Sequence, residues 1–181
     1  MTTARTKKIT YSALMCTLLI ISTLWLKFYI PGSSVMFTTQ VLFILLCGQI
    51  LPPSYCFAAV GTYLALGLMG IPVFSATQGL AVIPTPSFGY LLSFPVAAMA
   101  VSFVNTRIKK TRGHAYISSL AGLLIIYIIA LSYIYILQNI YFANPTSFTY
   151  LLQAYCLAFL PFDIIKALLA AFIGNKLSKI L

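Results

Sequence analysis

Two charged side chains stand close together inside a hydrophobic stretch, and one of them is the only acid in the chain. Asp163 is the single Asp or Glu among 181 residues, and it lies in the run AFLPFDIIKALLAAF at 158–172. Lys166 follows three residues later, a spacing that places both side chains on one face of a helix. The carboxylate only accepts hydrogen bonds, whereas the ammonium only donates them. The pair therefore suits a ligand with both kinds of polar group, such as an amide or a cyclic urea.

Asp163 is either a binding residue or half of a purely structural ion pair. A charged side chain near the centre of a bilayer costs about 2.5–3.5 kcal/mol on insertion scales, so its presence there needs a reason. A self-neutralising pair that holds its helix in a bundle is one reason, although such pairs often add no stability over apolar packing. Because the chain has no acid for a second such pair, we favour the ligand-binding role.

The composition around this pair is that of an integral membrane protein. Hydrophobic residues make up 61% of the chain and charged residues 7%, with a mean hydropathy of +1.02, whereas a soluble domain carries about 25% charged residues. At this length there is room for about six helices of roughly 20 residues. We predict an all-α integral membrane protein, with six transmembrane helices in one compact bundle that forms a single domain over residues 1–181.

Six apolar segments can be placed along the sequence, separated by stretches that contain Pro, Gly, Ser and Asn. The second and third segments are short for a full span, so we expect tilt or a thin local fit there. The connection at 71–87 is long, uncharged and mixed in character, which is typical of a lid or binding loop; an irregular or re-entrant connector is the alternative. The segments are 10–28, 36–51, 54–70, 88–106, 115–141 and 148–177.

Basic residues orient these predicted helices. The formal net charge is +10, but the basic residues cluster at segment ends, which indicates membrane orientation rather than nucleic-acid binding. An even number of spans puts all three clusters on one side, so we predict that both termini are cytoplasmic. Lys27 is the exception, because it lies at the outer end of the first segment, where it snorkels to headgroups or faces an external cavity. The clusters are Arg5, Lys7 and Lys8; Arg107, Lys109, Lys110 and Arg112; and Lys176 and Lys179.

Catalytic and metal-binding patterns are missing from the sequence. His114 is the only histidine, and no HExxH, GxSxG or phosphate-binding loop occurs. The cysteines show no CxxC spacing, and we interpret them as small apolar packing residues: Cys16, Cys47, Cys56 and Cys156. We therefore predict no enzyme activity, no metal and no cofactor.

Four stretches in order resemble the BioY family, the biotin-binding S components of energy-coupling factor (ECF) vitamin transporters. The resemblance implies a six-helix, multi-pass protein of a prokaryotic plasma membrane, which captures biotin from outside and pairs with a transmembrane T component and two ATPase subunits. The stretches are FTTQVLFILLCGQILPP (37–53), YLALGLMGIPVFS (63–75), TPSFGYLLSF (85–94) and FLPFDIIKA (159–167).

The resemblance also implies roles for particular residues. Asp163 and Lys166 match the Asp and Lys of the family pattern and would contact the ureido group of biotin. Ala13 and Thr17 match an Ala-xxx-Ala face of the first helix that docks on the T component, with Thr in place of the second Ala. Other residues would line the binding pocket: Gln40, Thr77, Gln78, Ser87 and Tyr90.

The chain departs from the family pattern at several positions near the expected pocket. Phe88 and Phe162 replace glycines and add bulk, Thr85 replaces another, and Leu91 stands where some members carry an Arg suited to a carboxylate. These changes leave lipoate, or another short-chain carboxylate cofactor, as an alternative ligand. A self-sufficient secondary transporter or channel is the second alternative, and a membrane enzyme is disfavoured by the missing catalytic groups.

Overall fold

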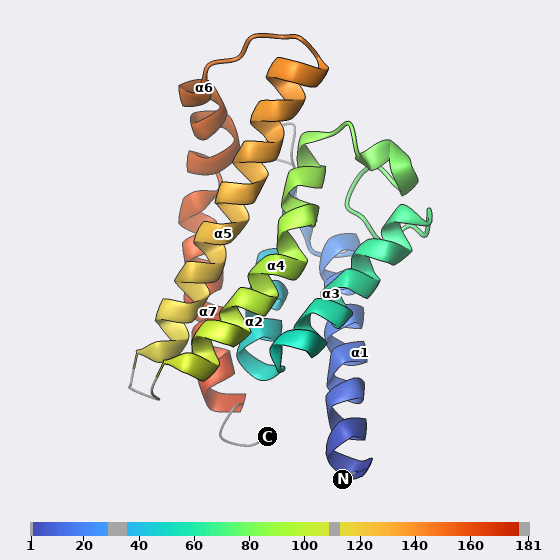
Figure 1. Cartoon of the computed structure of the whole chain (residues 1–181), viewed down its shortest axis with the longest axis vertical. Coiled ribbons are helices and arrows are strands. Elements are labelled where there is room, and N and C mark those ends of the chain that lie inside the picture. Colours follow the sequence, from blue (N-terminus) through green and yellow to red (C-terminus); the bar gives the residue numbers. More distant parts are fainter. Residues whose placement is uncertain (1, 29–35, 109–112, 178–181) are drawn as a thin grey trace.

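The fold is a bundle of antiparallel helices, seen in Figure 1 in a computed structural model that describes residues 2–28, 36–108 and 113–177. The long helices are α1 (Thr2–Leu24), α4 (Pro86–Arg107) and α5 (His114–Ile136), and the shorter ones are α2 (Gln40–Ile50) and α3 (Pro53–Leu68). The last segment comprises α6 (Phe148–Leu152), the π-helical turn η3 (Gln153–Leu157) and α7 (Leu160–Leu177). Four small elements complete the described chain: the strands β1 (Lys27–Phe28) and β2 (Phe37–Thr38), the 3₁₀ turn η1 (Gly79–Val82) and the π-helical turn η2 (Leu137–Tyr141).

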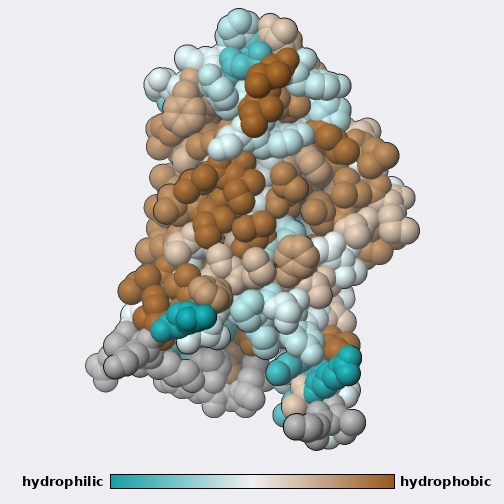
Figure 2. Space-filling model, viewed as in Figure 1, coloured by the Kyte–Doolittle hydropathy of each residue, from teal (hydrophilic) through white to brown (hydrophobic). Residues whose placement is uncertain are grey.

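Successive helical segments run in opposite directions, so the start of α1 and the end of α7 lie at the same end of the bundle (Figure 1). Arg107 at the end of α4 belongs to that end as well. Hydrophilic side chains gather there in Figure 2, next to the start of α1, and a broad hydrophobic surface covers the bundle beyond it. By the positive-inside rule, this is the cytoplasmic end.

The helices of the bundle differ in length. Among the described residues, three helices are long and apolar enough to span a bilayer, and α2 and α3 are shorter apolar helices, as predicted for the second and third segments. The prediction of one continuous helix over 148–177 is wrong, because the chain bends by 47° between the 148–157 and 160–177 parts. Pro161 accounts for the break, since it cannot donate a backbone hydrogen bond to the preceding turn.

Two other boundaries also differ from the prediction. The first helix begins at Thr2 rather than near residue 10, so the basic N-terminal cluster is part of α1. The α1–α2 connection contains a two-residue antiparallel pairing of β1 with β2, in which Lys27 lies opposite Thr38. Such a short pairing has no sequence signal, because two residues cannot display an alternating pattern.

Glycines bring α2 and α5 close against α4 in the core. A Cβ built on Gly48 of α2 would meet the Val101 Cβ at 2.5 Å, and one on Gly122 of α5 would meet the Val101 Cγ2 at 2.2 Å. Val101 itself is fully buried. Small residues allow this close packing of membrane helices, and the packing fixes α2, α4 and α5 as the frame on which the outer end of the bundle is built.

Candidate functional site

A cavity of about 230 Å³ opens at the outer end of the bundle. It lies where α2, α4 and α7 begin, and the connection between α3 and α4 closes one side. Its wall is mostly apolar with a few polar groups, which is typical of small-molecule sites. The lining residues are Met36, Phe37, Thr38, Gln40, Val41, Phe74, Ser75, Ala76, Thr77, Val82, Thr85, Pro86, Ser87, Tyr90, Leu91, Phe94, Phe159, Asp163 and Lys166.

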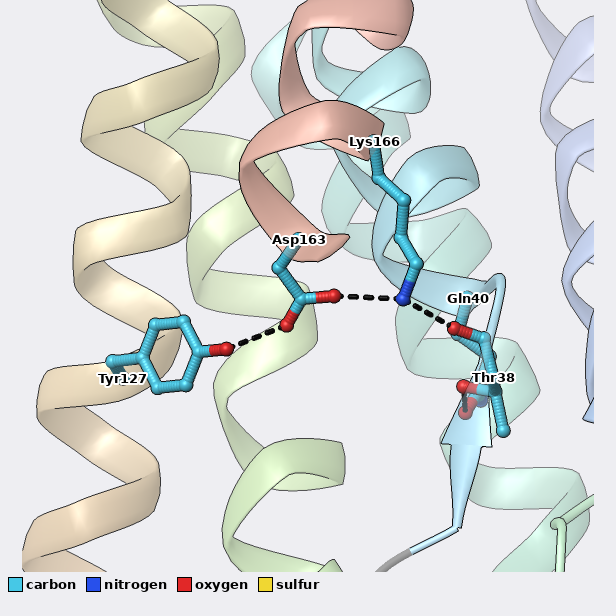
Figure 3. Close-up of polar contacts among 5 residues, drawn as sticks. All are labelled: Thr38, Gln40, Tyr127, Asp163 and Lys166. Atoms are coloured by element: carbon cyan, nitrogen blue, oxygen red, sulfur yellow. Dashed lines mark hydrogen bonds and ion pairs between the residues drawn. The ribbon is translucent and has the colours of Figure 1, made fainter. Parts of the chain in front are cut away.

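Asp163 and Lys166 meet in the wall of this cavity, one turn apart at the start of α7 (Figure 3). The Lys166 Nζ lies 2.7 Å from Asp163 Oδ1 and also donates to the Thr38 carbonyl at 2.7 Å. The second carboxylate oxygen, Oδ2, accepts a hydrogen bond of 2.6 Å from the Tyr127 hydroxyl of α5. The pair therefore ties α7 to α5 on one side and to β2, just before α2, on the other.

The pair is buried, and its surroundings hold both charges in fixed positions. The exposed fractions are 5% for Asp163 and 8% for Lys166. The Phe37 ring covers the ammonium at 3.8 Å from nitrogen to ring centroid, a cation–π contact. A buried ion pair is tolerated when its remaining hydrogen-bonding groups are satisfied. Here each carboxylate oxygen has a donor, so the carboxylate is held in one orientation toward the cavity.

Gln40 belongs to a second set of hydrogen bonds in the wall. Its Nε2 donates to the Tyr63 hydroxyl at 2.7 Å, and its Oε1 accepts from the Thr38 hydroxyl at 2.9 Å. Tyr63 in turn donates to the Val73 carbonyl at 3.2 Å. These bonds fix the orientation of the Gln40 amide. Its nitrogen can donate one further hydrogen bond, and its oxygen can accept one more.

The other predicted pocket residues separate into two groups. Thr77, Ser87 and Tyr90 line the cavity, as do Gln40, Asp163 and Lys166. Gln78 does not line it, because its amide is folded back on its own loop, accepting from the Phe74 N–H at 3.0 Å and donating to the Phe74 carbonyl at 2.9 Å. Gln78 therefore shapes the loop rather than presenting its amide to the cavity.

The two phenylalanines at positions where the family pattern predicts glycine do not line the cavity. Phe162 is 50% exposed and packs edge-on against Phe37 with ring centroids 5.2 Å apart. Phe88 packs in the same way against Tyr133 at 5.6 Å. Phe162 therefore touches the cavity wall through Phe37, which does line the cavity. Leu91, by contrast, is buried in the lining.

Several residues of the site were not predicted from the sequence. Tyr127 holds Asp163 from a helix 36 residues away, and it is one of 12 tyrosines with nothing local to distinguish it. Phe37 and the Thr38 carbonyl reach Lys166 only because β2 lies against the start of α7. Tyr63 orients Gln40 in the same indirect way. The signal that could have found them is chemical: a buried charged pair requires nearby donors, acceptors and aromatic rings.

The fold and site together define a class of membrane protein: a helix bundle with an outward-facing small-molecule cavity. A crystal structure of the S-component for biotin from an ECF-type ABC transporter superposes with a TM-score of 0.83 at 28% identity, covering 99% of this chain and 94% of that chain.

The family follows from the sequence comparisons. The whole chain, residues 1–181, matches the BioY family, and the chain belongs to that family. The biotin transporter BioY of Thermotoga maritima is 34% identical over 168 residues, 91% of this chain and 92% of that protein. The probable biotin transporter BioY of Lysinibacillus sphaericus is 30% identical over 152 residues, 83% of this chain and 78% of that protein. The resemblance seen in the sequence is confirmed, as are the multi-pass helical fold and the transport class rather than an enzyme.

Proposed function

We propose that this chain is the substrate-binding S component of an ECF-type importer and that its ligand is biotin. The observation that carries the proposal is the Asp163–Lys166 pair, buried in the wall of an outward-facing cavity with its partners in place. The relatives named as biotin transporters support the same ligand.

The pair has the right chemistry for a cyclic urea. A ureido ring presents N–H donors and one carbonyl acceptor. The Asp163 carboxylate accepts from the N–H groups, and the Lys166 ammonium donates to the carbonyl oxygen. The fixed orientation of both side chains means that little side-chain entropy is lost when the ligand binds. Gln40, Thr77, Ser87 and Tyr90 complete the polar lining.

Lipoate, the alternative ligand, has a dithiolane ring in place of the ureido ring. The dithiolane ring has no N–H or carbonyl to match the pair, so a buried carboxylate and ammonium would face sulfur and carbon. Polar groups left without partners on binding cost affinity. The geometry therefore favours biotin over lipoate.

Transport would require the T component and two ATPase subunits of an ECF complex. The Ala13 and Thr17 face of α1 is exposed on the side of the bundle, and the Thr17 hydroxyl donates to the Ala13 carbonyl at 3.0 Å. The hydroxyl is thus satisfied within the helix, which leaves a small, close-packing face of the kind that membrane helices use to associate. We propose this face as the T-component interface.

Liposomes separate this proposal from a self-sufficient transporter. Liposomes that contain the purified chain alone should bind biotin without accumulating it. Liposomes that also contain the T component and the ATPases should accumulate biotin when ATP is supplied. Gradient-driven uptake by the chain alone would support the secondary-transporter alternative, and absence of biotin binding in both preparations would refute the proposal.

A further inference from the structure

Lys27 is joined to two walls of the cavity without lining it. Its Nζ donates to the Ser75 carbonyl at 2.9 Å, and Ser75 is a lining residue. Its backbone pairs with β2 opposite Thr38, another lining residue. The Lys27 side chain is exposed. An exposed, flexible ammonium therefore stands at the rim of the cavity, one hydrogen bond from its wall.

The charge of Lys27 has no carboxylate side chain to balance it. Eleven Lys and Arg residues occur in the sequence, and only Lys27 and Lys166 lie outside the three basic clusters. Asp163 is the only acidic residue, and it is already bonded to Lys166. A basic residue at the outer end also opposes the positive-inside pattern of the other clusters. The rim of the cavity thus carries one uncompensated positive charge.

We propose that Lys27 binds the carboxylate of the transported ligand at the rim of the cavity. The inference rests on the proposed function, because it assumes a ligand whose polar ring occupies the Asp163–Lys166 end. Biotin carries its carboxylate on a short alkyl chain opposite the ureido ring. Apolar lining residues suit that alkyl chain, among them Val82, Leu91 and Phe94.

The present partner of Lys27 is one that a carboxylate can displace. The Ser75 carbonyl is a neutral acceptor, whereas a carboxylate forms a charge-assisted hydrogen bond that is about twice as strong. The four-carbon stem of Lys lets the ammonium move between the two acceptors. The Lys27–Ser75 bond also holds the 71–87 connection in place, so the competing explanation is that Lys27 only anchors that connection as a latch.

Two variants of Lys27 and two forms of the ligand distinguish these roles. The Lys27→Gln variant removes the charge but keeps an N–H donor for the Ser75 carbonyl, and Lys27→Arg keeps the charge. Affinities are measured by calorimetry on the purified full chain for biotin and for biotinamide, which is neutral. A carboxylate role predicts that the parent protein and Lys27→Arg prefer biotin, and that Lys27→Gln loses about threefold to tenfold in affinity for biotin alone.

A latch role predicts a different pattern. The Lys27→Gln variant would then weaken biotin and biotinamide by the same factor, and this result would overturn the inference. Equal affinities of the parent protein for the two ligands would overturn it as well. Lys7→Gln is the matched control, because it makes the same change in an exposed residue at the opposite end of α1.

The same experiment separates the inference from the proposed function. If the parent protein binds both ligands but the ratio of its biotin and biotinamide affinities is the same in the Lys27 variants, only the inference fails. If the parent protein binds neither, the biotin proposal fails, and the measurement is repeated with lipoate and lipoamide. If the parent protein then prefers lipoate over lipoamide and Lys27→Gln abolishes that preference, Lys27 keeps its carboxylate role with a different ligand. If there is no such preference, the inference is overturned.

Discussion

Two glutamines at opposite ends of α2 illustrate two uses of buried polar groups in this bundle. Gln40, at the outer end, lies in a cavity wall and makes its hydrogen bonds to Tyr63 and Thr38. Gln49, at the cytoplasmic end, donates to the Ala115 carbonyl at 2.8 Å and lies within hydrogen-bonding distance of two serine hydroxyls of α5. Both residues are buried, and both lie next to α7.

The difference between the two ends lies in what α7 presents to them. At the cytoplasmic end α7 offers Gly174, where an added Cβ would meet the Gln49 Cβ at 2.6 Å, so the glycine leaves room for the Gln49 side chain. At the outer end α7 offers Asp163 and Lys166, whose charges line a cavity. The Gln49 amide nitrogen contacts a backbone carbonyl and serine hydroxyls of the protein itself, which indicates a structural role. The outer cluster keeps donors and acceptors for a ligand.

The largest expected effect concerns the charged pair. The double variant Asp163→Asn/Lys166→Met removes both charges, so it leaves no unpaired buried ion. We expect at least about a thirtyfold loss in biotin affinity, since truncating a buried, hydrogen-bonded charge typically costs 2–5 kcal/mol in binding. Calorimetry measures the affinity, and the melting temperature in detergent measures the fold. A near-parental affinity would make the pair structural, like the Gln49 cluster.

The opposite outcome is expected at the cytoplasmic end. Gln49→Leu removes the amide that donates to the Ala115 carbonyl and contacts Ser118 and Ser119. Buried polar groups left without a partner cost about 1–3 kcal/mol, so the melting temperature should fall while biotin affinity stays within about twofold. The thermal unfolding curve with and without biotin tests both parts. A large, selective loss of affinity would show that the cytoplasmic cluster communicates with the cavity.

Tyr127 should have a smaller effect than the pair that it supports. Tyr127→Phe removes the hydroxyl that donates to Asp163 Oδ2 and keeps the ring that packs against Tyr90. Loss of a hydrogen bond to a charged group costs about 1.5–3 kcal/mol, part of which water in the cavity can recover. We expect a threefold to thirtyfold loss in affinity from equilibrium binding. A loss equal to that of the double variant would mean that Tyr127 contacts the ligand directly.

The smallest effect is expected at Phe162. Phe162→Gly removes a ring that braces Phe37 but does not line the cavity. An aromatic pair is worth about 0.5–1.5 kcal/mol, and only part of that reaches the ligand through Phe37, so affinity should fall by about threefold or less. Comparison of biotin and lipoate affinities in this variant shows whether Phe162 contributes to ligand selectivity. If the variant binds lipoate more tightly than biotin, Phe162 is a specificity residue.

The sequence predicted the local features of the site better than its long-range contacts. The Asp163–Lys166 pair depends on a three-residue helical spacing, which is visible in the sequence. The membrane class and the orientation follow from composition and basic clusters, which are also local. The Tyr127 contact depends on how α5 packs beside α7, and no spacing along the chain encodes that register. The bend in the last segment was missed because the apolar run continues unbroken across it, although Pro161 marks its place.

The role of the 71–87 connection was only partly predictable. Its length and lack of charge pointed to a binding loop, and Ser75, Ala76 and Thr77 do line the cavity. The use of Gln78 could not be predicted, because an amide serves equally well to bind a ligand or to fold back on its own backbone. The choice depends on the turn that the loop adopts, with Gly79 in a left-handed conformation at φ 63°.

The central claim is that the Asp163–Lys166 pair binds a ureido group. Competition between three ligands on the purified chain tests it most directly: biotin, desthiobiotin, which keeps the ureido ring but lacks the sulfur-containing ring, and lipoate, which has a carboxylate chain but no ureido group. The account predicts that desthiobiotin displaces biotin with an affinity within about tenfold of it, whereas lipoate displaces it at least about a hundredfold more weakly. Lipoate binding as tightly as biotin would contradict the claim.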